Sequence, residues 1–344
     1  MRLAAAAVAA ALLVTSCSAE HGPPADRRVR QEVLTDVEAA EGTKAFGDPA
    51  ALAFAANGDL WVGNYESSTL ARYPADAIKA WGTPDAATVI EGGAIKGPNA
   101  MVFDAHGYLW VAMYDGDRVA GFTPADLVAG RPPSLVLPDP GGVLRKPAGV
   151  ALDADGNLWV ANAGVGHLVR YPRRGGLEAG TARPDVVLDV VDAGCQGVGV
   201  RDGLLWLGCP DVDTAYAYAL PAKSGRPAVR TTYEWQGRCG PVQFAPAPDG
   251  TFAVACYHTG SVTPFEGGAG PSAPGAPFVR GRQAQVLTHV HGIAYDAEGA
   301  LWAGTNLNVI VRYALDATSG LPAVVLRPKA APLPSISSAE LSAG

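Results

Sequence analysis

Residues 155–162, Asp-Gly-Asn-Leu-Trp-Val-Ala-Asn, contain the pattern that decides the fold: a glycine turn followed by a short apolar strand with a Trp at its centre. Such an x-Gly pair supplies the positive φ that a tight hairpin needs. The pattern recurs every 47 to 49 residues, with the Trp position filled in turn by Trp61, Trp110, Trp159, Trp206, Ala253 and Trp302. A second aromatic column follows twelve residues later, at Tyr73, Phe122, Tyr171, Tyr218 and Phe265, with Tyr313 one residue early. Six copies therefore share one register.

Each copy predicts four short strands, which in the second copy are 100–103, 109–113, 118–122 and 135–137. The outer strand of the fifth copy is expected at 286–287. The first two are almost continuously apolar, which indicates burial on both faces. A single four-stranded sheet cannot cover both of its own faces, so the six sheets must pack on one another in a ring. We therefore expect an all-β fold, a six-bladed β-propeller of four-stranded antiparallel blades over 31–328. One end of the chain, 31–35 or 322–326, should complete the last blade and so protect its edge.

The composition supports this prediction and narrows the classes of possible partner. The chain has 344 residues, 48% hydrophobic and 17% charged, with 42 Gly and 28 Pro, which favours a turn-rich β protein. The net charge of −7 and the lack of any Lys/Arg block argue against a nucleic-acid partner. No apolar run approaches the ~20 residues of a spanning helix.

The start of the chain has the features of a targeting signal. Leu3 to Val14 is a short apolar run after Arg2, and Val14-Thr15-Ser16-Cys17 resembles the lipobox of bacterial lipoproteins. This implies a signal peptide over 1–17 with Cys17 as the lipidated residue, and the alternative is ordinary cleavage near Ser16. Residues 18–30 then form a tether and 329–344 a flexible tail. We expect a lipid-anchored protein of the bacterial cell envelope, on the outer membrane or the periplasmic face, touching the membrane only through its anchor.

Four cysteines remain, and they allow three pairings. Cys195 and Cys209 flank one glycine turn, and Cys239 and Cys256 flank the next. Cross-strand neighbours lie close enough for a disulfide. We prefer 195–209 with 239–256, and the rival is 195–239 with 209–256.

Three segments carry a family resemblance: 97–104 (Gly-Pro-Asn-Ala-Met-Val-Phe-Asp), 155–162 and 291–296 (His-Gly-Ile-Ala-Tyr-Asp). They resemble NHL-type propeller repeats, and the chain is similar to the six-bladed gluconolactonase (senescence-marker-protein-like) group and, more weakly, to the streptogramin B lyases. The resemblance implies that the first strand begins, and the second ends, at one mouth of a central channel. The implied channel-mouth row is Ala50, Asn99, Ala148, Gln196, Gly240 and His291. Two residues earlier stand Asp48, Gly97, Lys146, Gly194, Arg238 and His289.

The resemblance also implies a site chemistry, which this chain matches only in part. The lactonases hold a divalent metal through a Glu, two amide oxygens and an Asp, but the channel-mouth row offers only Asn99 and Gln196 as side-chain oxygen donors. A metal such as Ca²⁺ would therefore use Asn99, Gln196 and His291. The lyases use a His before a Gly and a Glu closing a neighbouring strand; His291-Gly292 matches the first feature, whereas Thr305 stands where the Glu would be.

The candidate catalytic residues are His289 and His291, expected to project into the channel on alternate positions of one strand. The alternative is one exposed loop His and one hydrogen-bonded channel His. Candidate ligand-binding residues are Asn99, Gln196, Arg238, Asp115, Asn64, Glu66 and His258. The alternative for the charged members is a solvated rim.

The sequence thus predicts a membrane-anchored binding or scaffold module, a monomer whose channel mouth takes a small molecule, a glycan or a protein. The alternative is a metal-dependent, lactonase-like hydrolase or lyase with a non-standard channel site.

Overall fold

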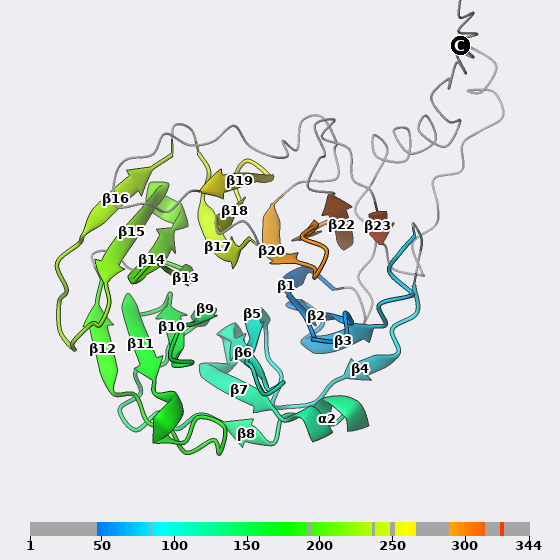
Figure 1. Ribbon diagram of the computed structural model, residues 1–344, viewed down its shortest axis with the longest axis horizontal. Helices are drawn as coiled ribbons and strands as arrows, with labels where there is room; N and C mark the ends of the chain where they lie inside the picture. The colour runs from blue at the N-terminus through cyan, green and yellow to red at the C-terminus, as the bar shows by residue number, and fades with distance from the viewer. Residues whose placement is uncertain are drawn as a thin grey trace, which may run out of the picture.

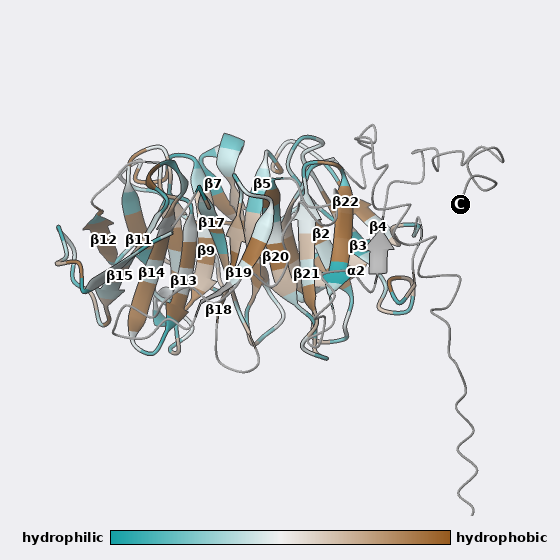
Figure 2. Ribbon diagram, turned by 90° about the horizontal axis from the view of Figure 1, so that it is seen from above, coloured by the Kyte–Doolittle hydropathy of each residue, from teal (hydrophilic) through white to brown (hydrophobic). Residues whose placement is uncertain are grey.

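Six sheets are arranged in a ring about a central axis in the computed structural model, which describes residues 47–80, 82, 84–190, 194–235, 238–247, 252–265, 289–313 and 324–326 (Figure 1). Each sheet is one blade, and its strands follow the chain from the axis outward. Five blades have four described strands and the fifth has three. The predicted all-β, six-bladed β-propeller is confirmed. Seen from the edge, apolar strands span the thickness of the disc, with polar residues in many of the loops at its two faces (Figure 2).

The strands of the first three blades are β1 (Pro49–Phe54), β2 (Leu60–Asn64), β3 (Thr69–Tyr73), β4 (Thr88–Ile90), β5 (Pro98–Phe103), β6 (Leu109–Met113), β7 (Arg118–Phe122), β8 (Leu135–Val136), β9 (Pro147–Leu152), β10 (Leu158–Asn162), β11 (His167–Tyr171) and β12 (Val186–Asp189). Those of the last three are β13 (Gly197–Arg201), β14 (Leu204–Cys209), β15 (Thr214–Ala219), β16 (Thr231–Glu234), β17 (Pro241–Pro246), β18 (Phe252–Cys256), β19 (Ser261–Phe265), β20 (Val290–Tyr295), β21 (Leu301–Thr305), β22 (Val309–Tyr313) and β23 (Val324–Leu326). One short α-helix, α2 (Pro124–Ala129), follows β7 and starts with a capping box made by Thr123 and Asp126.

The hydrophobic core lies between the blades. Six clusters of buried residues each join two neighbouring sheets, and one of them closes the ring by packing Trp302 and Ile310 of the last blade on Leu60 and Tyr73 of the first. The five Trp side chains of the repeat are at most 2% exposed. In three blades the Trp indole N–H donates to the Asp that directly follows the first strand, as Trp110 does to Asp104 at 3.1 Å. The Trp column therefore marks blade-to-blade packing.

The last blade is completed by the C-terminal one of the two candidate segments, because β23 pairs antiparallel with β22. The other candidate, 31–35, lies outside the described residues. So do the predicted signal peptide with Cys17, the tether, the tail over 329–344 and the predicted outer strand of the fifth blade at 286–287. No described helix is long and apolar enough to cross a bilayer.

Both preferred disulfides are present, Cys195–Cys209 and Cys239–Cys256, with Cα atoms 4.0 and 4.4 Å apart. Cys209 and Cys256 end the second strands of their blades. In the first and third blades an Asn holds this position: Asn64 Oδ1 accepts from Gly47 N–H at 3.2 Å, and Asn162 Oδ1 accepts from Arg145 N–H at 3.3 Å. The disulfide and the Asn side chain thus have the same role. Each links the end of a blade's second strand to the segment that precedes its first strand.

A hydrogen bond between blades repeats around the ring. The residue just before each third strand has a left-handed φ, and in four blades its side chain accepts from a backbone N–H that leads into the next blade. These bonds run from Gly97 to Ser68 Oγ (3.2 Å), Lys146 to Asp117 Oδ1 (2.7 Å), Gly240 to Asp213 Oδ1 (2.7 Å) and Asp48 to Asn308 Oδ1 (2.6 Å). The last of them joins the sixth blade to the first. Gly166 and Gly260 hold the position in the other two blades.

The ring-closing bond can be tested at Asn308. Asn308→Gly suits the left-handed φ of 58° but removes the acceptor, so the free energy of unfolding should fall by about 1 kcal/mol. Asn308→Ser keeps an acceptor, as Ser68 does in the first blade, and should lose less. Urea unfolding followed by Trp fluorescence measures both. If the Gly variant were as stable as the parent chain, the bond would have no role in closure.

Candidate functional site

One mouth of the channel holds a polar cavity of about 320 Å³, which we call the polar cup. Its wall is made by Asp48, Tyr65, Asn99, Tyr114, Gln196, Pro210, Asp211, Val242, Tyr257, His258 and His291. These residues come from all blades but the third, at the start of first strands and just after second strands. The predicted channel mouth is therefore a real cavity.

A bulge at the start of the first strand turns one side chain toward the axis. The extra residue is Ala50 in β1, Asn99 in β5 and Ala148 in β9, three members of the predicted channel-mouth row. In β17, however, the residue at the bulge is Val242 and not the predicted Gly240. Gly240 instead belongs to the row two residues earlier, because its carbonyl accepts from Tyr257 N–H, just as the Asp48 carbonyl accepts from Tyr65 N–H.

That earlier row has a left-handed backbone in every blade. It consists of Asp48, Gly97, Lys146, Gly194, Gly240 and His289, with φ between 47° and 85°. The predicted member Arg238 lies outside this row and is exposed. Left-handed φ is uncommon for residues other than glycine and is often kept where function needs it. Three of the six positions carry a titratable side chain in this conformation.

Asp48 has the most perturbed carboxyl group of the cup. Burial, aided by the nearby charge of Glu66, raises its pKa from 3.8 to about 6. Its Oδ1 is buried and accepts no hydrogen bond from any described residue. Asp48 thus offers a carboxylate that the protein does not itself neutralise, and Glu66 acts here through its charge.

Three tyrosines surround the cup, each directly after a second strand: Tyr65, Tyr114 and Tyr257. Tyr65 packs edge-on against Tyr114 with ring centroids 6.0 Å apart, and its hydroxyl donates to Asp115 Oδ1 at 3.3 Å. Burial and the Asp115 charge raise the pKa of Tyr65 to about 12, so the phenol stays protonated. Lys146 places its ammonium 5.4 Å from the centre of the Tyr114 ring. The wall therefore combines ring faces with hydroxyl groups.

The two candidate catalytic histidines are placed differently from each other. His291 is half-buried in the wall of the cup, and burial, with a smaller effect from the charge of His289, lowers its pKa to about 4. His289 is exposed and outside the wall, with its Nδ1 3.1 Å from Asn306 Nδ2. Both rings contact Tyr257, at centroid distances of 4.7 Å for His289 and 5.5 Å for His291. The two side chains do not project together into the channel, because the left-handed backbone at His289 turns it out of the strand.

Of the other predicted residues, some line the cup and the rest lie outside its wall. Asn99, Gln196 and His258 line the cup, with His258 Nδ1 3.9 Å from Asp213 Oδ1. Asn99 is 4% exposed, and its Nδ2 donates to the Ala148 carbonyl at 2.7 Å. Asp115 holds Tyr65 from outside the wall. Asn64 is fully buried, where its Oδ1 accepts from Gly47 and its Nδ2 donates to Thr69, so its role there is structural.

Sequence reasoning missed Gln243, which follows the cup residue Val242 in β17 and bonds to backbone groups of other blades. Its Nε2 donates to the carbonyls of Ala50 (3.5 Å) and Asn99 (3.3 Å), and its Oε1 accepts from Ile293 N–H at 2.8 Å. One side chain of the fifth blade thus reaches the first, second and sixth blades across the axis. The only available signal was a polar residue inside an otherwise apolar strand.

The residues that could hold a metal are amides and one imidazole. Within the described ranges, no group of three or more His, Cys, Asp or Glu side chains has the spacing of a metal site. The predicted set of Asn99, Gln196 and His291 all lie in the cup wall, and the depressed pKa keeps His291 in the neutral form that binds metals. The metal remains a prediction.

No family model matches the chain, and no curated protein matches it in sequence. Solved structures do match in fold. Virginiamycin B lyase from Staphylococcus aureus is 14% identical, with a TM-score of 0.55 over 80% of this chain and 83% of that one. A catalytically inactive His-to-Ala variant of the same lyase with quinupristin is 14% identical, with a TM-score of 0.51 over 81% and 88%. Kuenenia stuttgartiensis hydrazine synthase is 15% identical, with a TM-score of 0.54 over 81% and 80%. Likeness at these identities shows the β-propeller fold, which serves many functions.

Asp48 should make the stability of the protein depend on pH. Because its pKa is higher in the folded chain, stability falls as pH rises from about 4 to about 6 and stays lower above that range. Asp48→Asn tolerates the left-handed φ and removes the charge, so it should gain about 2–3 kcal/mol at pH 7.5 and much less at pH 4. Thermal unfolding at both pH values measures this. Asp211→Asn, an exposed carboxylate of the same wall, is the control, and an equal gain in both variants would contradict the assignment.

Gln243 should stabilise the ring more than other amides at the mouth. Gln243→Leu leaves the Ile293 N–H without its acceptor, so we expect a loss of about 1–3 kcal/mol in unfolding free energy. Gln196→Leu makes the same chemical change on the cup wall and should cost much less. Chemical denaturation of the two variants compares them, and equal losses would contradict a bridging role.

Proposed function

We propose that this protein is a binding propeller whose polar cup recognises a small, hydroxyl-rich ligand such as a glycan unit. The observation that carries the proposal is the wall itself: an unpaired carboxylate at Asp48 beside three tyrosine rings and the amides Asn99 and Gln196. Tyrosine faces pack on the apolar faces of sugar rings, while carboxylate and amide groups bond to hydroxyls. The volume of about 320 Å³ lies at the lower end of small-ligand sites, which suits one or two sugar rings.

The proposal includes a cellular location for the protein. A lipid on Cys17 would hold the cup at the surface of a bacterial envelope membrane, with the protein as a monomer. The lipobox-like segment supports this, and so do the two disulfides, because disulfides persist in oxidising compartments.

A second candidate is a metal-dependent lyase or hydrolase. The observation that favours it is the neutral His291 in the cup wall, followed by Gly292 as in the streptogramin B lyases. A His-to-Ala change inactivates the staphylococcal lyase that shares this fold. In such an enzyme His291 would accept a proton or, with Asn99 and Gln196, hold the metal.

Thermal shift on the full chain separates the two candidates. A ligand that binds only the native state raises the melting temperature. We expect at least one member of a mono- and oligosaccharide panel to raise it by a few degrees, and Tyr257→Ala to abolish the shift. Asp76→Ala is the control and should keep the shift, because Asp76 does not line the cup and follows the end of β3 that lies away from it.

The outcome that would overturn the binding proposal is specific. No sugar would shift the melting temperature, while Ca²⁺, Mn²⁺ or Zn²⁺ would bind one ion per chain, with binding lost in His291→Ala. Turnover of quinupristin or of a sugar lactone with that ion would then establish the enzyme.

A further inference from the structure

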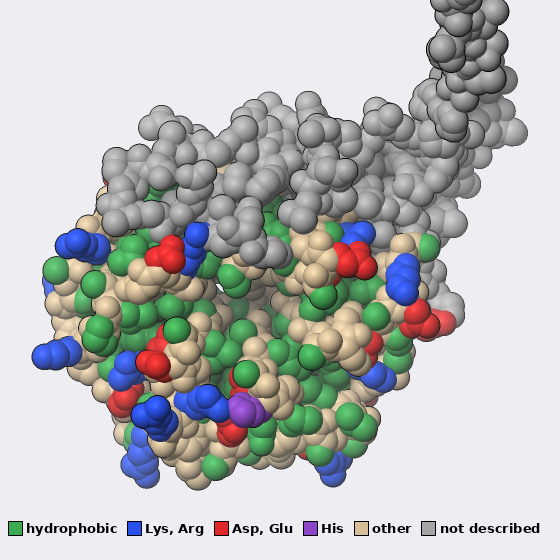
Figure 3. All heavy atoms as spheres, in the orientation of Figure 1, with side chains coloured by type: hydrophobic (Ala, Val, Ile, Leu, Met, Phe, Trp, Pro, Cys, Tyr) green, Lys and Arg blue, Asp and Glu red, His purple; other side chains and the backbone are tan. Residues whose placement is uncertain are grey.

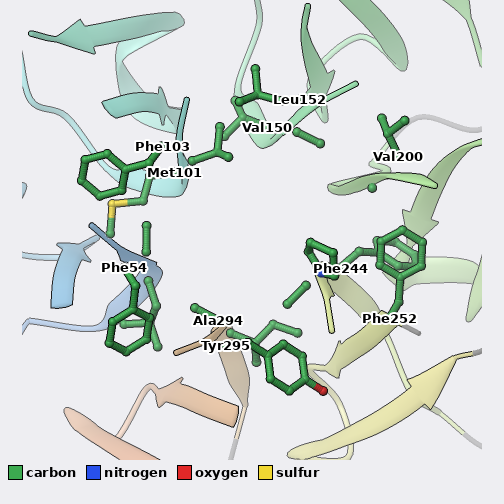
Figure 4. Close-up of a pocket in the computed structure, with 18 residues that line it drawn as sticks. Phe54, Met101, Phe103, Val150, Leu152, Val200, Phe244, Phe252, Ala294 and Tyr295 are labelled. Carbon is green, nitrogen blue, oxygen red and sulfur yellow. The ribbon is translucent and has the colours of Figure 1, made fainter. Parts of the chain in front are cut away.

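The opposite mouth of the channel holds a second cavity of about 430 Å³, which we call the apolar cup. It is lined by the far ends of the first strands of all six blades, with Phe252 from a second strand. Apolar side chains lie around this central space on all sides of the ring (Figure 4). In the space-filling view, hydrophobic side chains gather around the hollow at the middle of the ring (Figure 3).

The lining has almost no polar side chain. Of the 18 residues that form it, all but Tyr295 lack a polar side-chain atom. Aromatic rings come from several sides: Phe54, Phe103, Phe244, Phe252 and Tyr295. Phe54, Phe103 and Tyr295 are only half-buried within the protein and line the cavity, so part of each side chain is open to an occupant.

The apolar cup is separate from the polar cup. The amide of Gln243 is bonded to backbone groups of three blades between the two cavities, and no residue lines both. The two mouths therefore differ in the chemistry they offer.

Water is a poor occupant of such a space. At ~30 Å³ each, about 14 waters would fit, but they would face walls that supply almost no side-chain hydrogen bonds. Replacing them by an apolar molecule is favourable, and aromatic rings prefer edge-to-face or offset contact with one another. A charged molecule would find no side chain of opposite charge in this lining.

We propose that the apolar cup is a second binding site, for an uncharged small molecule that contains an aromatic ring system. Its volume lies well within the range of small-ligand sites. The site does not depend on the function proposed for the polar cup.

The test uses the uncharged fluorescent probe N-phenyl-1-naphthylamine with the full chain. We expect saturable binding of one probe per chain, seen as an increase in probe emission. Val200→Glu and Leu152→Glu place a carboxylate in the lining from two different blades and should each weaken binding at least tenfold. Val136→Glu makes the same change on an outer strand, at a side chain that is 45% exposed, and should leave binding unchanged.

Near-UV circular dichroism and the melting temperature show whether each variant remains folded. If one cup variant fails to fold, the other still decides the test. Absence of saturable binding to the parent chain would overturn the proposal, as would equal weakening by Val136→Glu. Loss of binding on adding a saccharide that fills the polar cup would also overturn it, because it would mean that the probe occupies that cup instead.

Discussion

The structure depends on one constraint: each sheet is apolar on both faces and can cover neither by itself. The six hydrophobic clusters all lie between neighbouring blades, so no blade has a core of its own. The blades are therefore stable only as a closed ring. The seam between the sixth and first blades carries the same packing as the others, through Trp302 and Leu60, and adds the hydrogen bond from Asp48 N–H to Asn308. Because these contacts join the sixth blade to the first, the sixth blade is built from consecutive strands, as the other described blades are.

Ring closure also fixes what the two channel mouths can do. Because every first strand lies beside the axis, its two ends contribute to opposite mouths. The starts of these strands carry bulges that turn polar side chains such as Asn99 and His291 inward, whereas their far ends carry apolar side chains such as Phe54 and Leu152. Gln243 divides the channel between them. The fold thus yields two cavities of opposite chemistry from one repeated strand.

The fold was predictable because its signals are local and repeated. The glycine turns and the cysteines that flank them mark single hairpins, and the Trp column recurs once per blade. Spacing alone therefore predicted six blades and favoured the two disulfides that the structure contains. The site was less predictable. The prediction of Gly240 at the channel mouth was wrong because it placed the row two residues away from the bulge at Val242. His289 lies outside the cup because its backbone is left-handed, a conformation that the local sequence does not predict. Gln243 bonds to residues as far as 193 positions away, a relation that exists only once the ring has closed.

Asp48 takes part both in ring closure and in the polar cup. Its backbone N–H closes the ring on Asn308, its backbone is left-handed, and its side chain lies in the polar cup with a raised pKa. Burial of a carboxylate without a partner lowers stability at neutral pH, and Gly97 and Gly240 show that the same backbone position accepts a residue with no side chain. The architecture therefore does not require an acid at this position. A costly group that the fold does not need, placed on a cavity wall beside three tyrosines, is what the proposed binding site would require.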